Sequence, residues 1–306
     1  MHSVGLFVIG HLVIFLSKVI YPFFKFKICY LRSSRIGQLT INFDIAYLKI
    51  PDNYHLLVFH EKAIANKFVL NFFSKQKKVF ISKFFSYLYY AIQYLDSDSH
   101  LIYKWFEYQP KFTFHYKKNS KIIFPKIDKS EIQKNFFNNE KSNQFVGLHA
   151  RNNLYLKKNK IEDKNNHNFR NFDFNDYTKT IDYLHSKKIN VIKLGEHFNE
   201  ENSNLINDKN IITSSKYFNN AKIDYYLNAY SKYNIIGNSG IVGVSSILRK
   251  KIVYANFIPM NLFNLSYCSP GSLILPKKLF SKEKNRLLTF KEMNQIDFDI
   301  HTNSDP

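Results

Sequence analysis

His149 and Arg151 are the residues with the clearest potential for chemistry, because they stand two apart at the end of an apolar run, QFVGLHAR. The run predicts a buried strand. Side chains alternate along a strand, so His149 and Arg151 should project from one side, with Ala150 facing the other way. Ligands of open α/β sheets bind beyond the carboxyl ends of the strands, where this pair would meet an anion. A structural role fits equally well, with Arg151 paired to a carboxylate and His149 packed under a loop.

A second candidate anion site lies in the segment IIGNSGIVGVSS, residues 235–246. It predicts a strand that ends at Gly237 and a helix that begins after Ser239 and Gly240. Glycine permits close backbone approach, and the free N–H groups of a helix N-terminus carry partial positive charge, so this turn could cradle a phosphate. The segment has neither the dinucleotide fingerprint nor the P-loop signature. An ordinary serine N-cap with tight helix packing is the alternative.

A polar loop, EDKNNHNFRNFD, follows the first of these strands and contains four candidate ligand-binding residues, Asp163, His167, Arg170 and Asn171. Loops often bind ligands because they need not pack, although a charge-rich linker is an equal alternative. Together, the cation pair, the glycine turn and the loop suit a diphosphate leaving group. Arginine makes paired N–H bonds to phosphate oxygens, and positive charge stabilises the anion that forms as a glycosyl bond breaks.

The elements that would hold these residues alternate between strand and helix. Strands are predicted at 143–150, 189–195, 210–213, 233–237 and 251–255, and helices at 172–188, at 221–232 and after 240. The first of these helices has Phe174, Tyr177, Ile181 and Leu184 at helical spacing. Such alternation predicts an α/β domain with a doubly wound parallel sheet and right-handed connections.

The first half of the chain is also α/β but less regular. A helix with Leu39, Phe43, Ala46 and Tyr47 at helical spacing is followed by strands at 54–59 and 77–82 and a helix at 83–95. A chain of 306 residues exceeds the usual size of one core, so two domains are expected. The polar stretch at 130–142 separates them. The predicted domains are therefore 32–140 and 141–306, after a hydrophobic segment at 1–31.

Residues 4–24 form an apolar segment about long enough to span a bilayer. The segment lacks a basic n-region and a small-residue cleavage site, so a secretory signal peptide is not expected. Three arrangements remain open: a helix on the membrane surface, favoured because His11 and Lys18 share a helical face, a helix across the membrane, or a core helix. If the segment crosses the membrane, the next domain is kept in the cytosol by the basic cluster Lys25, Lys27, Arg32 and Arg35.

The net charge of +20 suggests anionic partners such as phosphates, nucleic acid or acidic lipids. The lysines are dispersed, however, and pairs such as Lys277 and Lys278 are expected to be solvated. Since no nucleic-acid module is recognisable, no nucleic-acid partner is expected. Cys29 and Cys268 have no metal or redox spacing, so they predict buried thiols, no disulfide and a reducing compartment.

Four segments, at 35–49, 145–156, 163–196 and 234–259, resemble in that order a family of bacterial glycosyltransferases found with surface-polysaccharide genes. The family is itself distantly similar to O-fucosyltransferases, which share a His-x-Arg signature. The resemblance implies two Rossmann-like domains of GT-B type, with a nucleotide-sugar donor bound mainly by the second domain. It further implies a hexosyl- or fucosyltransferase-like enzyme that needs no metal or other cofactor.

The resemblance also implies the partners and the residue roles. The acceptor would be a glycan or a lipid-linked molecule, and the enzyme would work at the cytoplasmic face of the inner membrane or in the cytoplasm. Arg151 would bind the donor diphosphate, with His149 beside it. Asp163, His167, Arg170 and Asn171 would lie in a loop of the site. Asn238, Ser239 and Gly240 would form the turn that faces the phosphates. Arg35 and Gly37 would lie on the opposing loop of the first domain.

The chain departs from the family at two positions. Asn152 stands where the family usually has an acidic residue, and Gln38 where it has a histidine. Neutral Gln38 cannot take a proton, so Asp44 becomes the candidate catalytic base, although a surface carboxylate on a helix is the simpler interpretation of Asp44. The departures leave a catalytically degenerate membrane-peripheral scaffold as one alternative, beside a basic nucleic-acid-binding protein.

The motif Asp96-Ser97-Asp98 resembles the metal-binding Asp-x-Asp of the other major glycosyltransferase fold. Two carboxylates so spaced can hold a divalent ion against a diphosphate. The motif follows an aromatic helix, so a capping role explains it more simply. No metal site is therefore expected.

Overall fold

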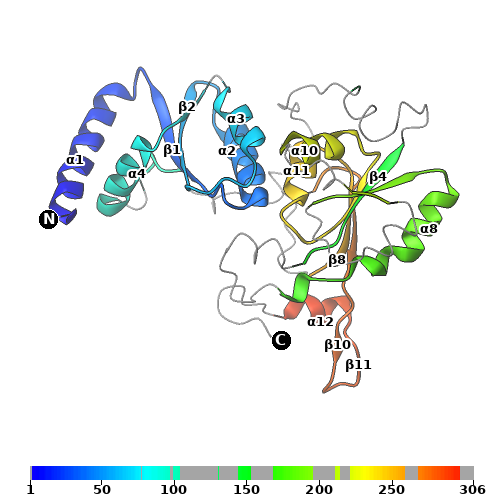
Figure 1. Cartoon of the computed structure of the whole chain (residues 1–306). Helices are drawn as coiled ribbons and strands as arrows, with labels where there is room; N and C mark the ends of the chain where they lie inside the picture. The colour runs from blue at the N-terminus through cyan, green and yellow to red at the C-terminus, as the bar shows by residue number, and fades with distance from the viewer. Residues whose placement is uncertain are drawn as a thin grey trace. The chain divides into compact units, whose positions relative to one another are not determined.

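The computed structural model describes residues 2–76, 78–96, 99–103, 130, 144–152, 168–195, 211–213, 221–258 and 268–296. The chain divides into two compact units, Met1–Pro125 and Lys126–Pro306. Both units are α/β, and each has its own parallel sheet (Figure 1). The predicted domain boundary after residue 140 falls outside the described residues, so it stays a prediction.

Unit 1 contains a three-stranded parallel sheet with the order β1-β2-β3. Its strands are β1 (Lys25–Leu31), β2 (Tyr54–His60) and β3 (Val79–Ile81). The structure confirms the predicted strands β2 and β3. It adds β1, which was not among the strands predicted from the sequence, although the alternation of Lys25 and Lys27 with the buried Phe26 and Ile28 is a strand signal.

A helical segment follows β1 and runs as a π-helix, η1 (Gln38–Asn42), into α2 (Phe43–Lys49). It confirms the predicted helix, and Leu39 and Phe43 on its apolar face are buried. Asp44 is buried as well, with an exposed fraction of 0%. The interpretation of Asp44 as a surface carboxylate is therefore wrong, because the first four residues of α2 are all buried.

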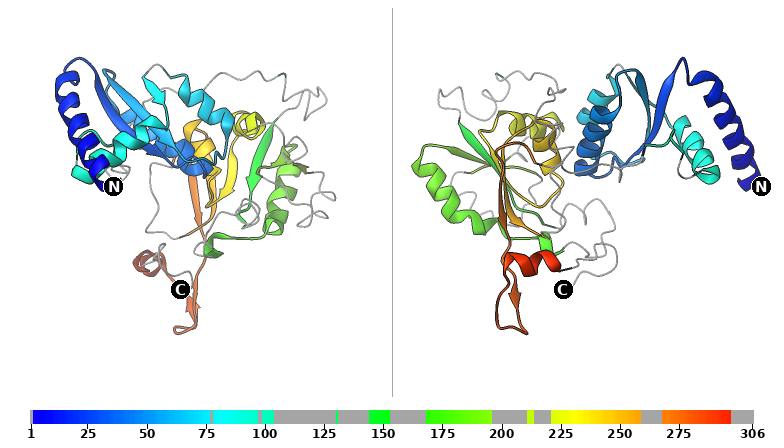
Figure 2. Two further views of the ribbon diagram at one scale, coloured as in Figure 1. Left: turned by 60° about the vertical axis from the view of Figure 1, so that its left-hand side comes forward. Right: turned by 180° about the vertical axis from the view of Figure 1, so that it is seen from behind.

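The described part of unit 1 contains three more helices, α1 (His2–Ile20), α3 (Lys67–Ser74) and α4 (Phe84–Leu95). α4 confirms the predicted aromatic helix and lies between α1 and the sheet (Figures 1 and 2). α1 packs on α4 and leaves most of its described apolar side chains exposed, which does not fit a helix packed in a core. Within the described part of the chain, no helix has the length and apolar character needed to cross a membrane.

Unit 2 contains a six-stranded, all-parallel sheet with the order β6-β5-β4-β7-β8-β9. The strands are β4 (Phe145–His149), β5 (Asn190–Lys193), β6 (Ile212–Thr213), β7 (Asn234–Gly237), β8 (Ile252–Phe257) and β9 (Leu273–Pro276). From β4 the chain adds β5 and β6 on one side, and then returns to add β7, β8 and β9 on the other (Figure 2). The predicted doubly wound parallel sheet is confirmed, and its topological switch point lies between β4 and β7.

The strands of unit 2 are linked through α8 (Thr178–Ser186), α10 (Ala221–Tyr230) and α11 (Val242–Ile247). A 3-10 turn, η4 (Phe174–Tyr177), precedes α8. One core cluster contains the four residues predicted on a helical face, Phe174, Tyr177, Ile181 and Leu184, together with Val146 and Leu148 of β4 and the partly buried Ala150. Because side chains alternate along a strand, His149 points away from this cluster, as predicted from its spacing to Ala150.

Three side chains with no exposed surface form a hydrogen-bonded network that ties β7 to α10 and α11. Asn234 Nδ2 donates to Asn228 Oδ1 and to Ser245 Oγ, both at 3.0 Å. Ser245 Oγ donates to Asn228 Oδ1 at 2.6 Å. Asn228 Nδ2 in turn donates to the backbone oxygen of Asp224 at 2.7 Å. Buried polar groups are costly unless they are paired, so this network specifies one packing of the two helices on β7.

The C-terminal part of unit 2 adds a hairpin, β10 (Phe280–Ser281) and β11 (Arg286–Leu287), and a helix, α12 (Phe290–Gln295). The sequence pattern does not indicate them, and neither does it indicate β9. Strands of two residues are too short to show a period, and α12 spans fewer than two turns.

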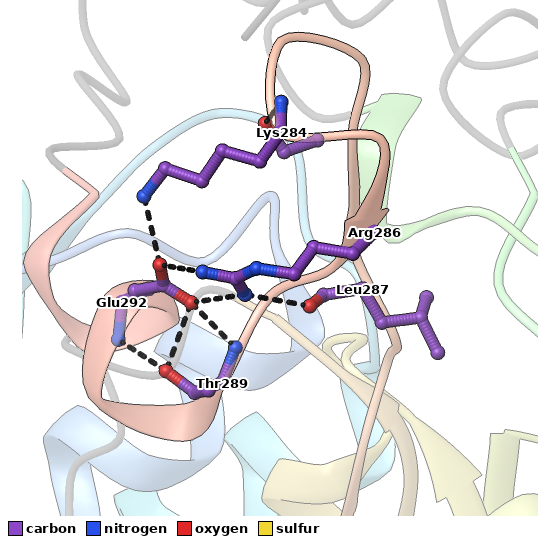
Figure 3. A network of polar contacts seen from close by, with 6 residues as sticks. Lys284, Arg286, Leu287, Thr289 and Glu292 are labelled. Carbon is purple, nitrogen blue, oxygen red and sulfur yellow. Dashed lines mark hydrogen bonds and ion pairs between the residues drawn. The ribbon is translucent and has the colours of Figure 1, made fainter.

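Glu292 joins α12 to the hairpin through several hydrogen bonds (Figure 3). Its carboxylate accepts from Lys284 Nζ, from both terminal nitrogens of Arg286 and from the backbone N–H of Thr289. Thr289 Oγ1 accepts from the backbone N–H of Glu292, which completes a capping box. These donors lower the pKa of Glu292 well below its usual value. Because its partners Lys284 and Arg286 are exposed, these ion pairs contribute little to stability.

We expect Asn228→Ala to destabilise unit 2 by about 3 kcal/mol, because it removes one acceptor that serves two buried donors. Hydrogen exchange of the β7 amides measures this locally, without a contribution from unit 1. Asn175→Ala, at an exposed position of η4, is the matched control and should change little. Equal exchange rates in the two variants would contradict the structural role of the network.

Candidate functional site

The switch point between β4 and β7 brings together two residues that the sequence predicts for an anion site. His149 ends β4 and pairs in register with Ile236 of β7. Ser239 lies two residues beyond the end of β7. His149 Nδ1 and Ser239 Oγ are 3.2 Å apart and form a hydrogen bond. The interpretation of Ser239 as a helix cap is wrong, because α11 begins only at Val242 and its N-cap residue is Ile241.

The imidazole of His149 is neutral at physiological pH. Its pKa is lowered from 6.5 to about 3, foremost by burial and then by the positive charges of Lys193 and Arg151. Lys193 is the last residue of β5 and is 9% exposed. Lys193 is not among the site residues predicted from the sequence, although a lysine at the end of a largely apolar strand, INVIKLG, is a detectable signal. The site therefore combines a neutral histidine with two nearby cations.

Arg151 is held by the loop that follows η3 (Asn168–Arg170). Its side chain is nearly buried, with an exposed fraction of 7%, and its guanidinium donates to Asn171 Oδ1. The backbone oxygen of Arg151 accepts from the N–H of Phe172 at 3.2 Å. Two further predicted site residues, Arg151 and Asn171, are thus in direct contact. An amide partner orients the guanidinium and adds no negative charge.

Lys277, which directly follows β9, holds the same loop through hydrogen bonds, although it lies more than a hundred residues later in the sequence. Its Nζ donates to the backbone oxygens of Phe169 and Asn171, each at 3.0 Å. Burial lowers the pKa of the Lys277 ammonium. The prediction that this lysine is solvated is wrong, whereas its neighbour Lys278 is exposed. Its sequence context contains no signal, because the two carbonyls it contacts lie more than a hundred residues earlier in the chain.

The glycine turn after β7 is occupied by protein atoms at its first position. A Cβ at Gly237 would lie 2.3 Å from Cε1 of Phe172, so this glycine makes room for an aromatic ring. Asn238 Nδ2 donates to the backbone oxygen of Ile258 at 2.7 Å, which anchors the turn to the end of β8. Within the turn, Ser239 is partly exposed and Gly240 is exposed, and their role in binding an anion stays a prediction.

The remaining predicted residues fall into two groups. Arg170 is half-buried next to Asn171 in unit 2, whereas Asp163 and His167 lie outside the described residues. Arg35, Gly37 and Asp44 belong to unit 1, where Arg35 and Gly37 lie in the turn before η1 and Asp44 is buried in α2. Their catalytic and donor-binding roles stay predictions.

Glu61 orders the loop that leads to Arg35, and the sequence analysis did not select it. Its carboxylate accepts from the backbone N–H of Ser34 and from the hydroxyl of Tyr30, both at 2.9 Å. Burial raises the pKa of Glu61, but these hydrogen bonds and the charge of Arg32 outweigh burial and lower it below its usual value. A carboxylate so held is a structural group and a weak base.

No cluster of three or more histidine, cysteine, aspartate or glutamate side chains suited to a metal ion occurs among the described residues. Asp96 is the C-cap residue of α4, which agrees with the capping interpretation of the Asp-Ser-Asp motif, while Ser97 and Asp98 lie outside the described part. Cys29 and Cys268 are buried free thiols, as predicted.

The chain has no match among known protein families or among curated protein sequences. Solved structures with a similar arrangement include E. coli ADP-heptose LPS heptosyltransferase II, at 11% identity, a TM-score of 0.48 and coverage of 90% of this chain and 96% of that one. A glycosyl transferase family 9 protein from Veillonella parvula has 9% identity, a TM-score of 0.48 and coverage of 82% and 85%. E. coli heptosyltransferase WaaC with ADP has 10% identity, a TM-score of 0.42 and coverage of 88% and 98%. Similarities at this level carry no conclusion about the activity of this chain.

The depressed pKa of His149 predicts an acid-dependent loss of stability. Between pH 6.5 and about pH 3 the unfolded chain binds a proton at His149 that the folded chain does not bind, so the free energy of unfolding falls as the pH falls. We expect His149→Asn to lose less thermal stability than the parent between pH 7 and about pH 5. If the melting temperatures of the two proteins fall equally between pH 7 and about pH 5, the lowered pKa of His149 is contradicted.

We expect Lys277→Met to release the loop at 168–172, because two hydrogen bonds to its carbonyls are lost. The amide of Phe172 should exchange about tenfold faster, since each such bond contributes about 1 kcal/mol or more. Hydrogen exchange measures the effect, and Lys278→Met at the exposed neighbouring position is the control. Unchanged exchange in Lys277→Met would remove the anchoring role of Lys277.

Proposed function

We propose that the protein is a glycosyltransferase of GT-B type that transfers a sugar from a nucleoside-diphosphate donor to a glycan or lipid-linked acceptor in surface-polysaccharide synthesis. The observation that supports this most is the group at the switch point of unit 2, where Arg151 and Lys193 place positive charge around the neutral His149 and its partner Ser239. This is the edge at which doubly wound sheets bind nucleotides. A GT-B arrangement needs two α/β units with parallel sheets, and the chain has one such sheet in each of its two units.

Arg151 would stabilise the leaving group. When the bond between the sugar and the diphosphate breaks, negative charge grows on the phosphate oxygens, and a planar guanidinium donates two parallel N–H bonds to them. Asn171 already fixes one side of this guanidinium, so little rotamer freedom is lost when the donor binds. Lys193 adds a second positive charge through space, in surroundings where burial weakens screening by salt.

His149 would act as a neutral group. With a pKa of about 3, His149 is not an imidazolium near pH 7, so it cannot act as a general acid toward a leaving phosphate. Its hydrogen bond to Ser239 instead fixes the position of the turn after β7, whose hydroxyl and following backbone N–H groups can bind phosphate oxygens. The cations then supply the charge and the imidazole supplies the geometry.

The proposal includes further points that follow from the family resemblance. The enzyme would need neither a metal ion nor another cofactor, and it would work at the cytoplasmic face of the inner membrane. The donor would be bound by unit 2, with Asp163, His167 and Arg170 in the site loop. The catalytic base would come from unit 1, and if it is Asp44, a segment must first open, because this carboxylate is fully buried.

A nucleotide screen tests the proposal. The full chain is melted in EDTA with GDP, UDP, dTDP, CMP or ADP, and we expect one nucleotide to stabilise it, by about 2.7 kcal/mol at a hundredfold excess over the dissociation constant. Arg151→Lys should weaken this nucleotide about tenfold or more, because a point ammonium cannot replace the planar fork. Arg286→Lys, at an exposed arginine of the same unit, is the control and should bind like the parent.

The screen also separates the alternatives. Binding to nucleic acid that weakens steeply with salt, without a shift by any nucleotide, would favour a nucleic-acid-binding protein. Nucleotide binding without glycosyl transfer would favour a catalytically degenerate scaffold. Full nucleotide affinity in Arg151→Lys would contradict the role given to Arg151.

A further inference from the structure

The helix α1 exposes an unusually large apolar surface. Its residues Phe7, Val8, Ile9, Leu12, Phe15, Leu16, Val19 and Ile20 are 40–64% exposed, and Phe23 in the turn that follows is 91% exposed. A surface helix of a globular domain normally exposes a polar face. Contiguous apolar surface of this extent marks a site of interaction with a protein or a membrane.

α1 contacts unit 1 along one narrow strip. Gly10 is its buried residue there, and a Cβ at Gly10 would lie 2.7 Å from the backbone oxygen of Ala91 and 2.5 Å from Cδ1 of Leu95. The backbones of α1 and α4 therefore approach closely, and the two helices lie side by side (Figures 1 and 2). Among the side chains of α1 that the structure describes, most of the apolar ones lie outside this packing and are exposed.

The neighbouring helix α4 has an exposed aromatic stripe of its own. Its Ala91 and Ile92 are buried, and Ile92 belongs to a core cluster with the sheet of unit 1. On another face, Phe84, Tyr87, Tyr90 and Tyr94 recur every three or four residues and are 51–63% exposed. Tyrosines gather at the boundary between lipid and water, because the ring is apolar and the hydroxyl is hydrated. A face intended for water would not repeat aromatic residues in this way.

Positive charge predominates in the sequence around these helices, although the exposed Asp96 is the C-cap residue of α4. The first acidic residue of the chain is Asp44, and between Glu61 and Asp96 there are six lysines and no acidic residue. α4 contains no charged residue, and Lys83, directly before it, is exposed. A cationic border around an apolar face attracts anionic lipid headgroups. It disfavours a second copy of the same chain, because pairing would bring two positive surfaces together.

We propose that the exposed faces of α1 and α4 together form a surface that binds a lipid bilayer containing anionic lipids. The apolar side chains of α1 would enter the boundary between headgroups and acyl chains, and the tyrosines of α4 would lie at headgroup level. The surface goes beyond glycosyl transfer and does not depend on it. It would bring the chain to the place where a lipid-linked acceptor is found.

Vesicle flotation tests the surface on the full-length chain. The probes are vesicles of phosphatidylcholine alone and vesicles of phosphatidylcholine with phosphatidylglycerol. We expect the parent to float with the anionic vesicles and less with the neutral ones. Tyr87→Glu should lower binding to the anionic vesicles about tenfold or more, because the new carboxylate is repelled by the headgroups and resists burial.

The matched control is Tyr183→Glu on α8 of unit 2. Tyr87 and Tyr183 are 63% and 62% exposed, so the two substitutions change charge and surface equally at different places. Tyr183→Glu should bind vesicles like the parent. If Tyr87→Glu does not fold, Tyr94→Ser at a second position of the stripe replaces it, with a melting curve as the check of folding.

Two results would overturn the proposal. One is equal flotation of the parent and the Tyr87 variant, or no flotation of either. The other is a parent dimer, seen by light scattering without vesicles and lost in Tyr87→Glu, which would assign the surface to a second copy of the chain. The nucleotide-dependent melting shift should be the same in Tyr87→Glu and the parent, so failure of this surface and failure of the proposed activity are distinguishable.

Discussion

The site in unit 2 depends on one constraint: β4 and β7 are neighbours in a parallel sheet, and the chain turns away from their shared boundary in opposite directions. The carboxyl ends of the two strands therefore meet where no crossover helix has to cover both. His149 from one strand and Ser239 after the other come within hydrogen-bond distance only because of this adjacency. The buried network of Asn228, Asn234 and Ser245 holds β7 in that position from the far end of the strand.

The chemistry of the site follows from which groups carry charge. Burial and two cations keep His149 neutral, so the positive charge stays on Arg151 and Lys193. Arg151 is oriented by an amide, and the loop that provides this amide is held by Lys277 through backbone oxygens. These contacts fix the position of the Arg151 guanidinium. Such an arrangement suits the binding of a diphosphate better than the transfer of a proton.

The contrast between the units reflects how their residues are patterned. In unit 2 the apolar periods of 172–188 and of the strands agree with one fold, so the parallel sheet and its buried residues Phe174, Ile181 and Leu184 could be predicted. In unit 1 the strand β1 was missed, although its lysines alternate with buried apolar residues, because the alternation covers only four residues directly after a long apolar segment. Asp44 could not be predicted as buried, since a carboxylate in an amphipathic helix is normally solvated and only the packing around α2 decides otherwise.

The sequence by itself determined the doubly wound sheet of unit 2, the position of His149 and Arg151 at the end of β4 and the polar turn after β7, because strand and helix periods and turn residues act locally. The prediction that His149 and Arg151 are a pair of cations is wrong, because burial keeps His149 neutral. Only the tertiary structure decided which residues meet. Lys193 lies near His149, and Lys277 holds the loop of Asn171, through contacts between segments far apart in the chain. Gly237 likewise makes room for the ring of Phe172. Such contacts depend on strand order and loop path, and no local period encodes these. The apolar residues of α1 are likewise evident in the sequence, but their exposure depends on how α1 packs on α4 at Gly10.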